Sequence, residues 1–293
     1  MELCLPPHQH MNRGKGWLPC GGHWLLVAGG LLLRFSVCAQ EYPKLTHVIS
    51  YEELQKKSIQ RKVEWVNPDQ TQEELIFTEM AVPIDEAMKK KTRQFVHEVY
   101  GLDSIYLNPR LIVFHAMGDG NLKTSLEVSS FLHNQIPESW GTLSKAGNLP
   151  NGAHFIIDRD GKIFCLSPPS SYEKENHRWL IKRHQDGNPV AIGIENVTPK
   201  ENYTNLTAGQ IESNAKLARW LISFEQQKIK FISSHHQFND EAGYDRFLNF
   251  FVLKNFRKQY RTRQRLDIGN KNITTLLKKI NQRGIVVRSF FDQ

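Results

Sequence analysis

Cysteine is scarce in this chain of 293 residues. Three of its four cysteines lie within the first 39 residues, which leaves only Cys165 in the remainder. An intrachain disulfide is therefore excluded after residue 39, and the fold must depend on its core or on a metal. Long hydrophobic runs are also missing, because the longest, Trp24–Leu33, is about half of what a membrane-spanning helix needs. These absences exclude a disulfide scaffold and a polytopic membrane protein.

The start of the chain has the three parts of a secretory signal. Two basic residues precede the apolar run Trp24–Leu33, and Val37-Cys38-Ala39 supplies the small-residue pattern of a cleavage site. We predict a signal peptide over residues 1–39 and a mature chain that begins at Gln40. The protein is then exported to the periplasm, the cell envelope or the extracellular space, and it makes no stable membrane insertion after cleavage. An uncleaved anchor is the alternative.

The charge balance is basic. The full chain carries a formal net charge of +8, and removal of the leader leaves +6 over 254 residues. Such a charge on an exported protein suits an anionic target such as a wall or membrane surface, although plain solubility explains it equally well. Six basic residues lie in Lys254–Arg265. We interpret them as a solvated helix face or an arm toward an anionic polymer, since the leader argues against nucleic acid.

The hydrophobic pattern predicts an α/β fold with a central mixed β-sheet flanked by helices. Several apolar runs indicate strands, and their continuous apolar character indicates a sheet covered on both faces. Amphipathic spacing indicates helices over residues 84–99, Lys123–Gln135 and Thr207–Gln227, the last with Thr207 as N-cap. The predicted strands are Leu111–Phe114, His154–Ile157, Ile163–Leu166, Val190–Ile194, Lys230–Ile232 and, before them, Lys62–Val66.

We divide the chain into four segments, of which the leader is the first. After the leader, residues 40–107 are interpreted as an N-terminal extension with one helix, packed on a main domain over residues 108–252. Residues 253–293 form a basic C-terminal segment. We expect a monomer. Asp158-Arg159-Asp160-Gly161 reads as a hairpin turn rather than a calcium loop, because it lacks enough spaced oxygen ligands.

Residues suited to metal or proton chemistry follow the predicted strands. His115 ends the first run of the main domain, Glu195 follows Ala191–Ile194, and His235 and His236 follow Phe231–Ser234. Asp245 comes ten residues after His235. Two imidazoles and a carboxylate are a plausible three-ligand set for zinc with an open fourth position, which hydrolysis requires. His236 competes with His235, and Asp240 competes with Asp245.

Four segments in this order, "LIVFHAMGDG", "GAHFIIDRDGKIFCL", "RHQDGNPVAIGIENV" and "ISSHHQFNDEAGYD", resemble the zinc-dependent N-acetylmuramoyl-L-alanine amidases of the type-2 amidase and peptidoglycan-recognition-protein family. The resemblance covers about residues 108–250. It implies a type-2 amidase-like fold and hydrolysis of the amide between N-acetylmuramic acid and L-alanine. The implied partners are peptidoglycan and muropeptides.

The resemblance also implies roles for individual residues. His115, His235 and Asp245 correspond to the Zn²⁺ ligands, and Glu195 corresponds to the catalytic acidic residue beside the metal-bound water. Arg183 and His184 are candidates for lining the substrate groove. His154, which opens its strand, is interpreted as structural, bonding across the sheet.

One position departs from the family pattern. A lysine usually stands two residues before the third ligand, where it stabilises the oxyanion, and here that position is Gly243. Arg246, Tyr244 or His184 are candidates to replace it. The departure keeps a second hypothesis open, a module of the same fold that binds peptidoglycan without cutting it. A surface-binding structural protein that uses the basic C-terminal arm is a third.

Overall fold

The fold is described from a computed structural model of the chain. The structure describes residues 51–117, 121–123, 153–181, 189–199, 205–234 and 268–290. All of them belong to one compact unit, residues 45–293. In chain order the elements are α1 (Tyr51–Lys56), β1 (Ile59–Val66), β2 (Gln72–Glu79), α2 (Glu86–Tyr100), β3 (Leu111–Met117), β4 (Phe155–Ile157), β5 (Ile163–Cys165), β6 (Ala191–Val197), α4 (Ala208–Phe224), β7 (Phe231–Ser234), α6 (Asn270–Ile280), the short 3₁₀ helix η3 (Asn281–Arg283) and β8 (Arg288–Ser289).

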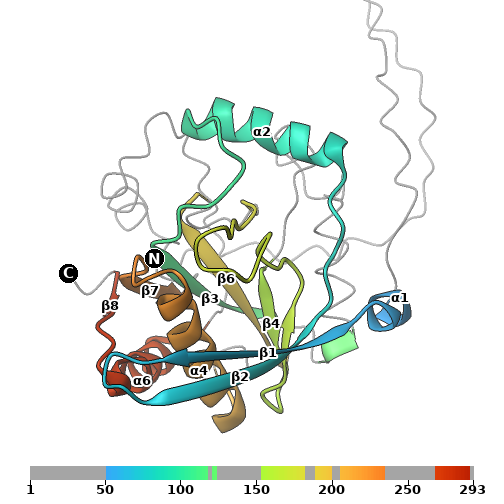
Figure 1. Cartoon of the computed structure of the whole chain (residues 1–293). Coiled ribbons are helices and arrows are strands. Elements are labelled where there is room, and N and C mark those ends of the chain that lie inside the picture. Colours follow the sequence, from blue (N-terminus) through green and yellow to red (C-terminus); the bar gives the residue numbers. More distant parts are fainter. Residues whose placement is uncertain are drawn as a thin grey trace, which may run out of the picture. The chain divides into compact units, whose positions relative to one another are not determined.

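One mixed sheet holds all eight of these strands, in the order β1-β2-β5-β4-β6-β3-β7-β8 (Figure 1). The pairs β2–β5, β4–β6, β6–β3, β3–β7 and β7–β8 are parallel, whereas β1–β2 and β4–β5 are antiparallel. The sheet and its helices confirm the predicted α/β class. The predicted strands are also confirmed, and their ends shift by one to three residues.

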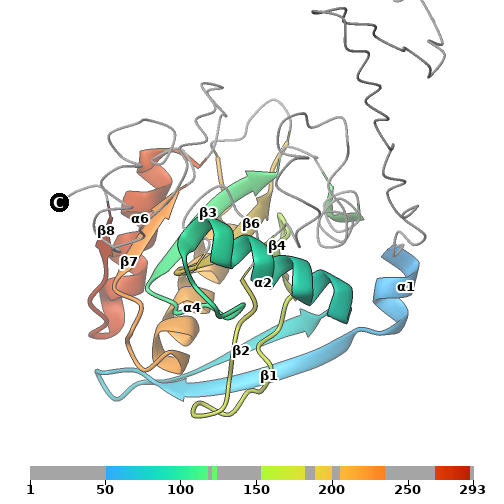
Figure 2. The same ribbon diagram turned by 90° about the horizontal axis from the view of Figure 1, so that it is seen from above.

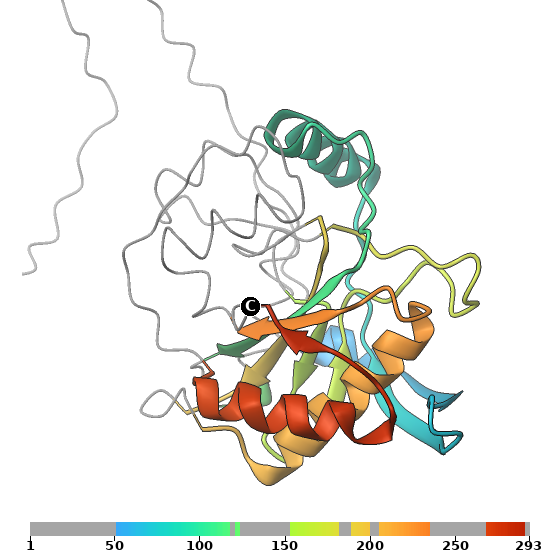
Figure 3. The same ribbon diagram turned by 90° about the vertical axis from the view of Figure 1, so that its left-hand side faces the viewer.

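The central strands are buried on both faces, as their continuous apolar sequences predicted. Every residue of β4 and β5 is buried, and so are the first five residues of β3. Helices α4 and α6 lie together on one side of β3, β6 and β7, and α2 lies on the other side (Figures 2 and 3). The rigid apolar floor that a site needs is therefore present beneath the ends of these strands.

Helix α4 begins where the sequence predicted it. The Thr207 side chain accepts a hydrogen bond from the backbone of Gln210, and the Gln210 side chain accepts one from the backbone of Thr207, which forms a capping box. Its apolar face is buried against the sheet. The helix ends at Phe224, three residues before the predicted end, because Gln226 and Gln227 adopt left-handed backbone conformations.

The helix predicted over residues 84–99 is α2, and it also ends for the predicted reason. Gly101 has a φ of 65°, and its N–H donates to the carbonyl of His97. Left-handed backbone of this kind suits glycine because no Cβ opposes it. Val96 and Tyr100 pack with Ile181 in a small separate cluster.

The β4–β5 hairpin confirms the turn at residues 158–161. The N–H of Gly161 donates to the carbonyl of Asp158, and the N–H of Asp158 donates to the carbonyl of Lys162. Gly161 has a φ of 89°, and a Cβ there would lie 2.9 Å from the Ser213 hydroxyl oxygen. Glycine is therefore required both by the turn and by the close approach of α4.

Several elements were not predicted from the sequence. Strand β2, the short helix α1, helix α6 and strand β8 all add to the fold. Strand β2 pairs with β1 along eight residues and joins the sheet through β5, so the N-terminal hairpin continues the sheet. The domain boundaries at residues 39, 107 and 252 stay predictions.

Two predicted features fall outside the described residues, the helix Lys123–Gln135 beyond its first residue and the basic segment Lys254–Arg265. Cys165 is fully buried and forms no disulfide within the described residues. In the described part of the chain no helix has the length and apolar character needed to cross a membrane.

Candidate active site

The carboxyl ends of parallel strands β3, β6 and β7 lie at one edge of the sheet, which we call the carboxyl edge. His115 stands near the end of β3 and pairs in register with Glu195 of β6. His115 is 7% exposed, and Glu195 is half-buried. Polar residues at this position sit above a rigid apolar floor, which is where binding sites form in open sheets.

The two side chains share one face of the sheet. Phe114 and Ile194, the preceding residues, belong to the core that contains α4. Because successive side chains alternate between faces and register partners in parallel strands lie side by side, His115 and Glu195 point to the face opposite α4. On that face a second apolar cluster contains Ile156, the register partner of Glu195 on β4.

Strand β7 is in register with the same edge. Its last residue, Ser234, pairs with Phe114, the residue before His115. His235 is the next residue in the chain after Ser234, the last residue of β7. His235 itself lies outside the described residues, as do Asp245, Arg183 and His184, and their predicted roles stay predictions.

A ladder of buried amides supports this edge from below. The Nδ2 of Asn196 donates to the carbonyl of His115 at 3.1 Å, and the Nδ2 of Asn214 on α4 donates to the Oδ1 of Asn196 at 2.6 Å. Gln210 donates from Nε2 to the carbonyl of Val197 at 2.8 Å. Hydrogen bonds from α4 therefore hold the ends of β3 and β6, which carry His115 and Glu195, in a fixed position.

The sequence analysis missed these positioning residues. Asn196, Asn214 and Gln210 are each 0% exposed. Their signal was the presence of an amide in an apolar strand, "AIGIEN", and of two amides on the apolar face of a helix. Asn196 is also the first residue of an Asn-Val-Thr glycosylation sequon, and its burial and two hydrogen bonds leave no room for a glycan in the folded protein.

His154 has the structural role predicted for it. Its Nε2 lies 3.1 Å from the carbonyl oxygen of Leu180, and its Nδ1 accepts a hydrogen bond from the N–H of Gly193 at 3.1 Å. A carbonyl only accepts, so the proton is on Nε2 and the ring is neutral. His154 therefore joins β6 to the loop before it and is not available for chemistry.

No group of three or more histidine, cysteine, aspartate or glutamate residues within the described ranges is placed to bind a metal. His115 is the one predicted ligand inside those ranges. The carboxyl edge thus presents an imidazole and a carboxylate side by side, the pair of groups that hydrolysis by acid–base or metal-assisted chemistry uses.

Comparisons with known proteins identify the class of this domain. Residues 106–246 match the family model described as N-acetylmuramoyl-L-alanine amidase. No curated protein sequence matches the chain. This part of the chain is therefore similar to the N-acetylmuramoyl-L-alanine amidases. The match contains His115, Glu195, His235 and Asp245.

Solved structures of such amidases are also similar to the chain. The endolysin amidase LysCS from Clostridium intestinale is 22% identical, with a TM-score of 0.30 over 50% of this chain and 86% of that chain. A selenomethionine derivative of AmpD is 20% identical, with a TM-score of 0.30 over 45% of this chain and 76% of that chain. PlyL is 13% identical, with a TM-score of 0.30 over 62% of this chain and 97% of that chain.

Proposed function

We propose that the protein hydrolyses the amide bond between N-acetylmuramic acid and L-alanine in peptidoglycan or its fragments, as a zinc enzyme outside the cell. The observation that carries the proposal is the register pair of His115 and Glu195 at the carboxyl edge, within the segment that matches the amidase family. The predicted secretory leader supports an extracellular wall substrate.

Zn²⁺ would be held by His115, His235 and Asp245. Two observations support this set: His115 is buried near the end of β3, and His235 directly follows β7, which pairs with β3, in the chain. When bound, zinc would supply Lewis acidity that lowers the pKa of a bound water toward about 7. Imidazole and carboxylate ligands are the donor set that zinc prefers in hydrolytic sites.

Glu195 is proposed to move the proton. Its carboxylate accepts the proton of the attacking water and returns it to the amine nitrogen as the amide bond breaks. Half-burial suits this role, since Glu195 is partly exposed although the other residues of β6 are buried. Arg183 and His184 are proposed to contact the saccharide or the peptide, and His184, Tyr244 or Arg246 to stabilise the oxyanion in place of the lysine absent at position 243.

The proposal is tested with purified protein and soluble muropeptides. We expect release of the free stem peptide by mass spectrometry, loss of release after chelation, and recovery on addition of zinc. Metal analysis of the wild type against His235→Ala and His236→Ala should show that only the first variant loses zinc.

Two results would contradict the proposal. Release of stem peptide that survives chelation would exclude the zinc reaction. If protein with one bound zinc per chain released no stem peptide, the alternative would be favoured. That alternative, suggested by glycine at position 243, is a module of the same fold that binds peptidoglycan without hydrolysing it.

A further inference from the structure

A groove of about 570 Å³ lies far from the candidate active site. It is bordered by the tip of the β1–β2 hairpin, the loop from α4 to β7, the loop before Trp179, and the segment that precedes β8. The residues used below are Gln70, Lys174, Ser223, Gln226, Gln227 and Lys230.

The groove and the candidate active site lie at opposite ends of the parallel strands. Lys230 is the residue before β7, and its N–H donates to the carbonyl of Arg110, the residue before β3. His115 is the fifth residue of β3, which places it about 13 Å along the strand from Leu111. We call the end that bears Lys230 the amino edge, and the groove there belongs to no part of the site described above.

The groove gathers strained backbone. Gln70, Gln226 and Gln227 have φ values of 67°, 49° and 58°, and they are the only residues other than glycine with positive φ in the described ranges. All three line the groove. Glycine or asparagine usually occupies such positions after a helix, because a longer side chain opposes the left-handed conformation. Backbone strain of this kind clusters at functional sites.

The groove also gathers uncompensated positive charge. Lys174 and Lys230 are exposed, and neither has an ion-pair partner among the residues that the structure describes. Some lysines near the hairpin and α4 are paired, as Lys62 is with Glu64 and Glu74, and Lys279 is with Glu212. The Ser223 hydroxyl and the glutamine amides add hydrogen-bonding groups to the lining of the same groove.

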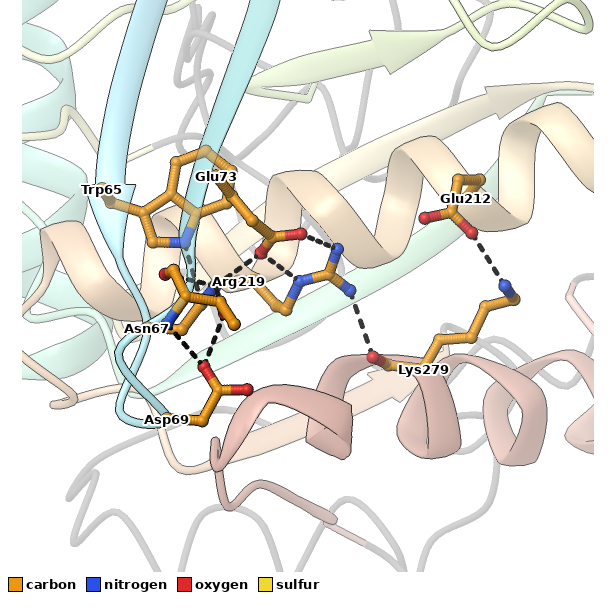
Figure 4. Close-up of polar contacts among 8 residues, drawn as sticks. Trp65, Asn67, Asp69, Glu73, Glu212, Arg219 and Lys279 are labelled. Carbon is orange, nitrogen blue, oxygen red and sulfur yellow. Dashed lines mark hydrogen bonds and ion pairs between the residues drawn. The ribbon is translucent and has the colours of Figure 1, made fainter.

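Buried polar contacts hold the hairpin wall in place. Both oxygens of the Glu73 carboxylate accept hydrogen bonds from Arg219 on α4, at 2.6 and 2.7 Å, and Asn67 donates to the same carboxylate at 2.8 Å (Figure 4). Asn67 also accepts from the Trp65 indole at 3.0 Å. The hairpin tip that carries Gln70 is therefore fixed to α4 rather than free to swing.

A second buried network holds the opposite wall. Glu225, 1% exposed, directly precedes the two glutamines, and its Oε1 lies 2.6 Å from the Nε2 of His177 and accepts from the Trp179 indole at 2.7 Å. The Nδ1 of His177 lies 2.8 Å from the carbonyl oxygen of Lys174. The loop that carries Lys174 is thus tied to the end of α4. Such preorganisation lowers the cost of ordering a site when a ligand binds.

We propose that this groove is a second binding site for the wall polymer, which takes the carboxylate-bearing peptide stems of peptidoglycan. Lys174 and Lys230 pair with stem carboxylates, and the side chains of Ser223 and the glutamines bond to the amides of the peptide. The identity of the polymer rests on the proposed function. Because the two sites lie at opposite edges of one sheet, the groove holds the enzyme on intact wall while the carboxyl edge acts on a separate strand.

The test measures sedimentation of the full chain with purified insoluble peptidoglycan, and separately the hydrolysis of a soluble muropeptide. We expect the double variant Lys174→Gln with Lys230→Gln to weaken wall binding about tenfold through loss of two charge-assisted hydrogen bonds. Its kcat/KM on the soluble muropeptide should stay within about twofold of the wild type. The matched control is Lys228→Gln with Lys271→Gln, which removes the same charge from exposed positions outside the groove and should bind as the wild type does.

Two further variants separate a binding role from a structural one. Gln226→Gly and Gln227→Gly relieve left-handed strain and should each raise Tm by about 2 °C, while each weakens wall binding about threefold. A gain of stability together with a loss of binding is not expected of residues that only shape the loop. Chitin, which has the acetamido sugars without the peptide stems, should bind the wild type at least about tenfold more weakly than peptidoglycan.

Wall binding by the Lys174/Lys230 variant equal to that of its matched control, or equal binding of the wild type to chitin, would overturn the proposal. Failure of the two proposals is distinguishable. Absent hydrolysis with lysine-dependent wall binding counts against the amidase reaction alone, and hydrolysis with lysine-independent wall binding counts against the groove alone.

Discussion

The carboxyl edge and the amino edge of the same sheet are built in different ways. At the carboxyl edge, His115 and Glu195 stand in register on neighbouring strands, and each follows directly from an apolar run. At the amino edge, the groove depends on contacts between residues far apart in the chain, such as Glu73 with Arg219 and His177 with Glu225. At the carboxyl edge, the short stretch of sequence before each residue is enough to predict its position. At the amino edge, the position of each groove residue depends on contacts with distant parts of the chain.

The largest expected effect concerns the carboxyl edge. His115→Ala should lower kcat/KM on a soluble muropeptide by at least about 10³-fold, because the proposed zinc site would lose one of its three ligands. The circular dichroism spectrum should not change, and wall binding should stay within about twofold, since the amino edge is untouched. A variant that keeps more than a tenth of the wild-type activity would remove His115 from the reaction.

Arg219→Met breaks the amino edge instead. The Arg219 and Glu73 side chains are 6% and 13% exposed, so removal of the guanidinium leaves a buried carboxylate without its main partner. We expect a loss of about 3–5 kcal/mol in the free energy of unfolding, measured by denaturant titration.

The control for Arg219→Met lies beside it in Figure 4. Lys279→Met removes the pair with Glu212, whose side chains are 36% and 56% exposed, and should cost at most about 1 kcal/mol. Equal losses for the two variants would show that the buried network adds nothing to the stability of the hairpin.

Asn214→Ala tests the ladder that joins α4 to the carboxyl edge. Asn214 donates to both Asn196 and the carbonyl of Gln210, so its loss should cost about 1–3 kcal/mol in the free energy of unfolding. We also expect a lower kcat, because the end of β3 loses its support. Glu212→Ala on the exposed side of the same helix should change stability by about 0.5 kcal/mol or less. An unchanged kcat in Asn214→Ala would limit the ladder to stability.

The smallest effect is a dependence on pH. Burial raises the pKa of the Glu73 carboxyl, but hydrogen bonds from Arg219 and Asn67 outweigh it, and the pKa lies below its usual value of 4.5. Glu73 therefore adds stability that is complete above its unfolded pKa and is lost as the pH falls through the lower folded pKa. The stability difference between wild type and Glu73→Gln should shrink below pH 4.5. A constant difference between pH 7 and pH 3 would contradict this linkage.

The sequence predicted the parts of the fold in which one stretch of chain decides its own structure. Strands β3 and β6 are continuous apolar runs, and α4 has both a capping residue and a helical apolar stripe. Strand β2 was missed because three of the eight residues in its sequence, QEELIFTE, are acidic, and only its position beside β5 and against α4 buries Leu75 and Phe77.

The same limit applies to the sites. His115 and Glu195 were found because each ends an apolar run. The sequence analysis did not single out Arg219 and Glu225, because their burial depends on partners 146 and 48 residues away in the chain. The sequence around Gln226 and Gln227 does not predict a left-handed backbone conformation, because glycine usually occupies such positions.

The outer strand of the sheet has a consequence for how the molecule behaves among its neighbours. Within the described ranges β1 is the outermost strand and pairs only with β2. Along its other side, its eight residues therefore leave a row of backbone donors and acceptors without a partner strand. Such a row is a template on which another chain can add a strand, and charged side chains there discourage it. Arg61, Lys62 and Glu64 stand along β1, and Lys62 bridges to Glu64 and Glu74. The sheet can therefore end in water without recruiting a neighbouring molecule into a growing aggregate.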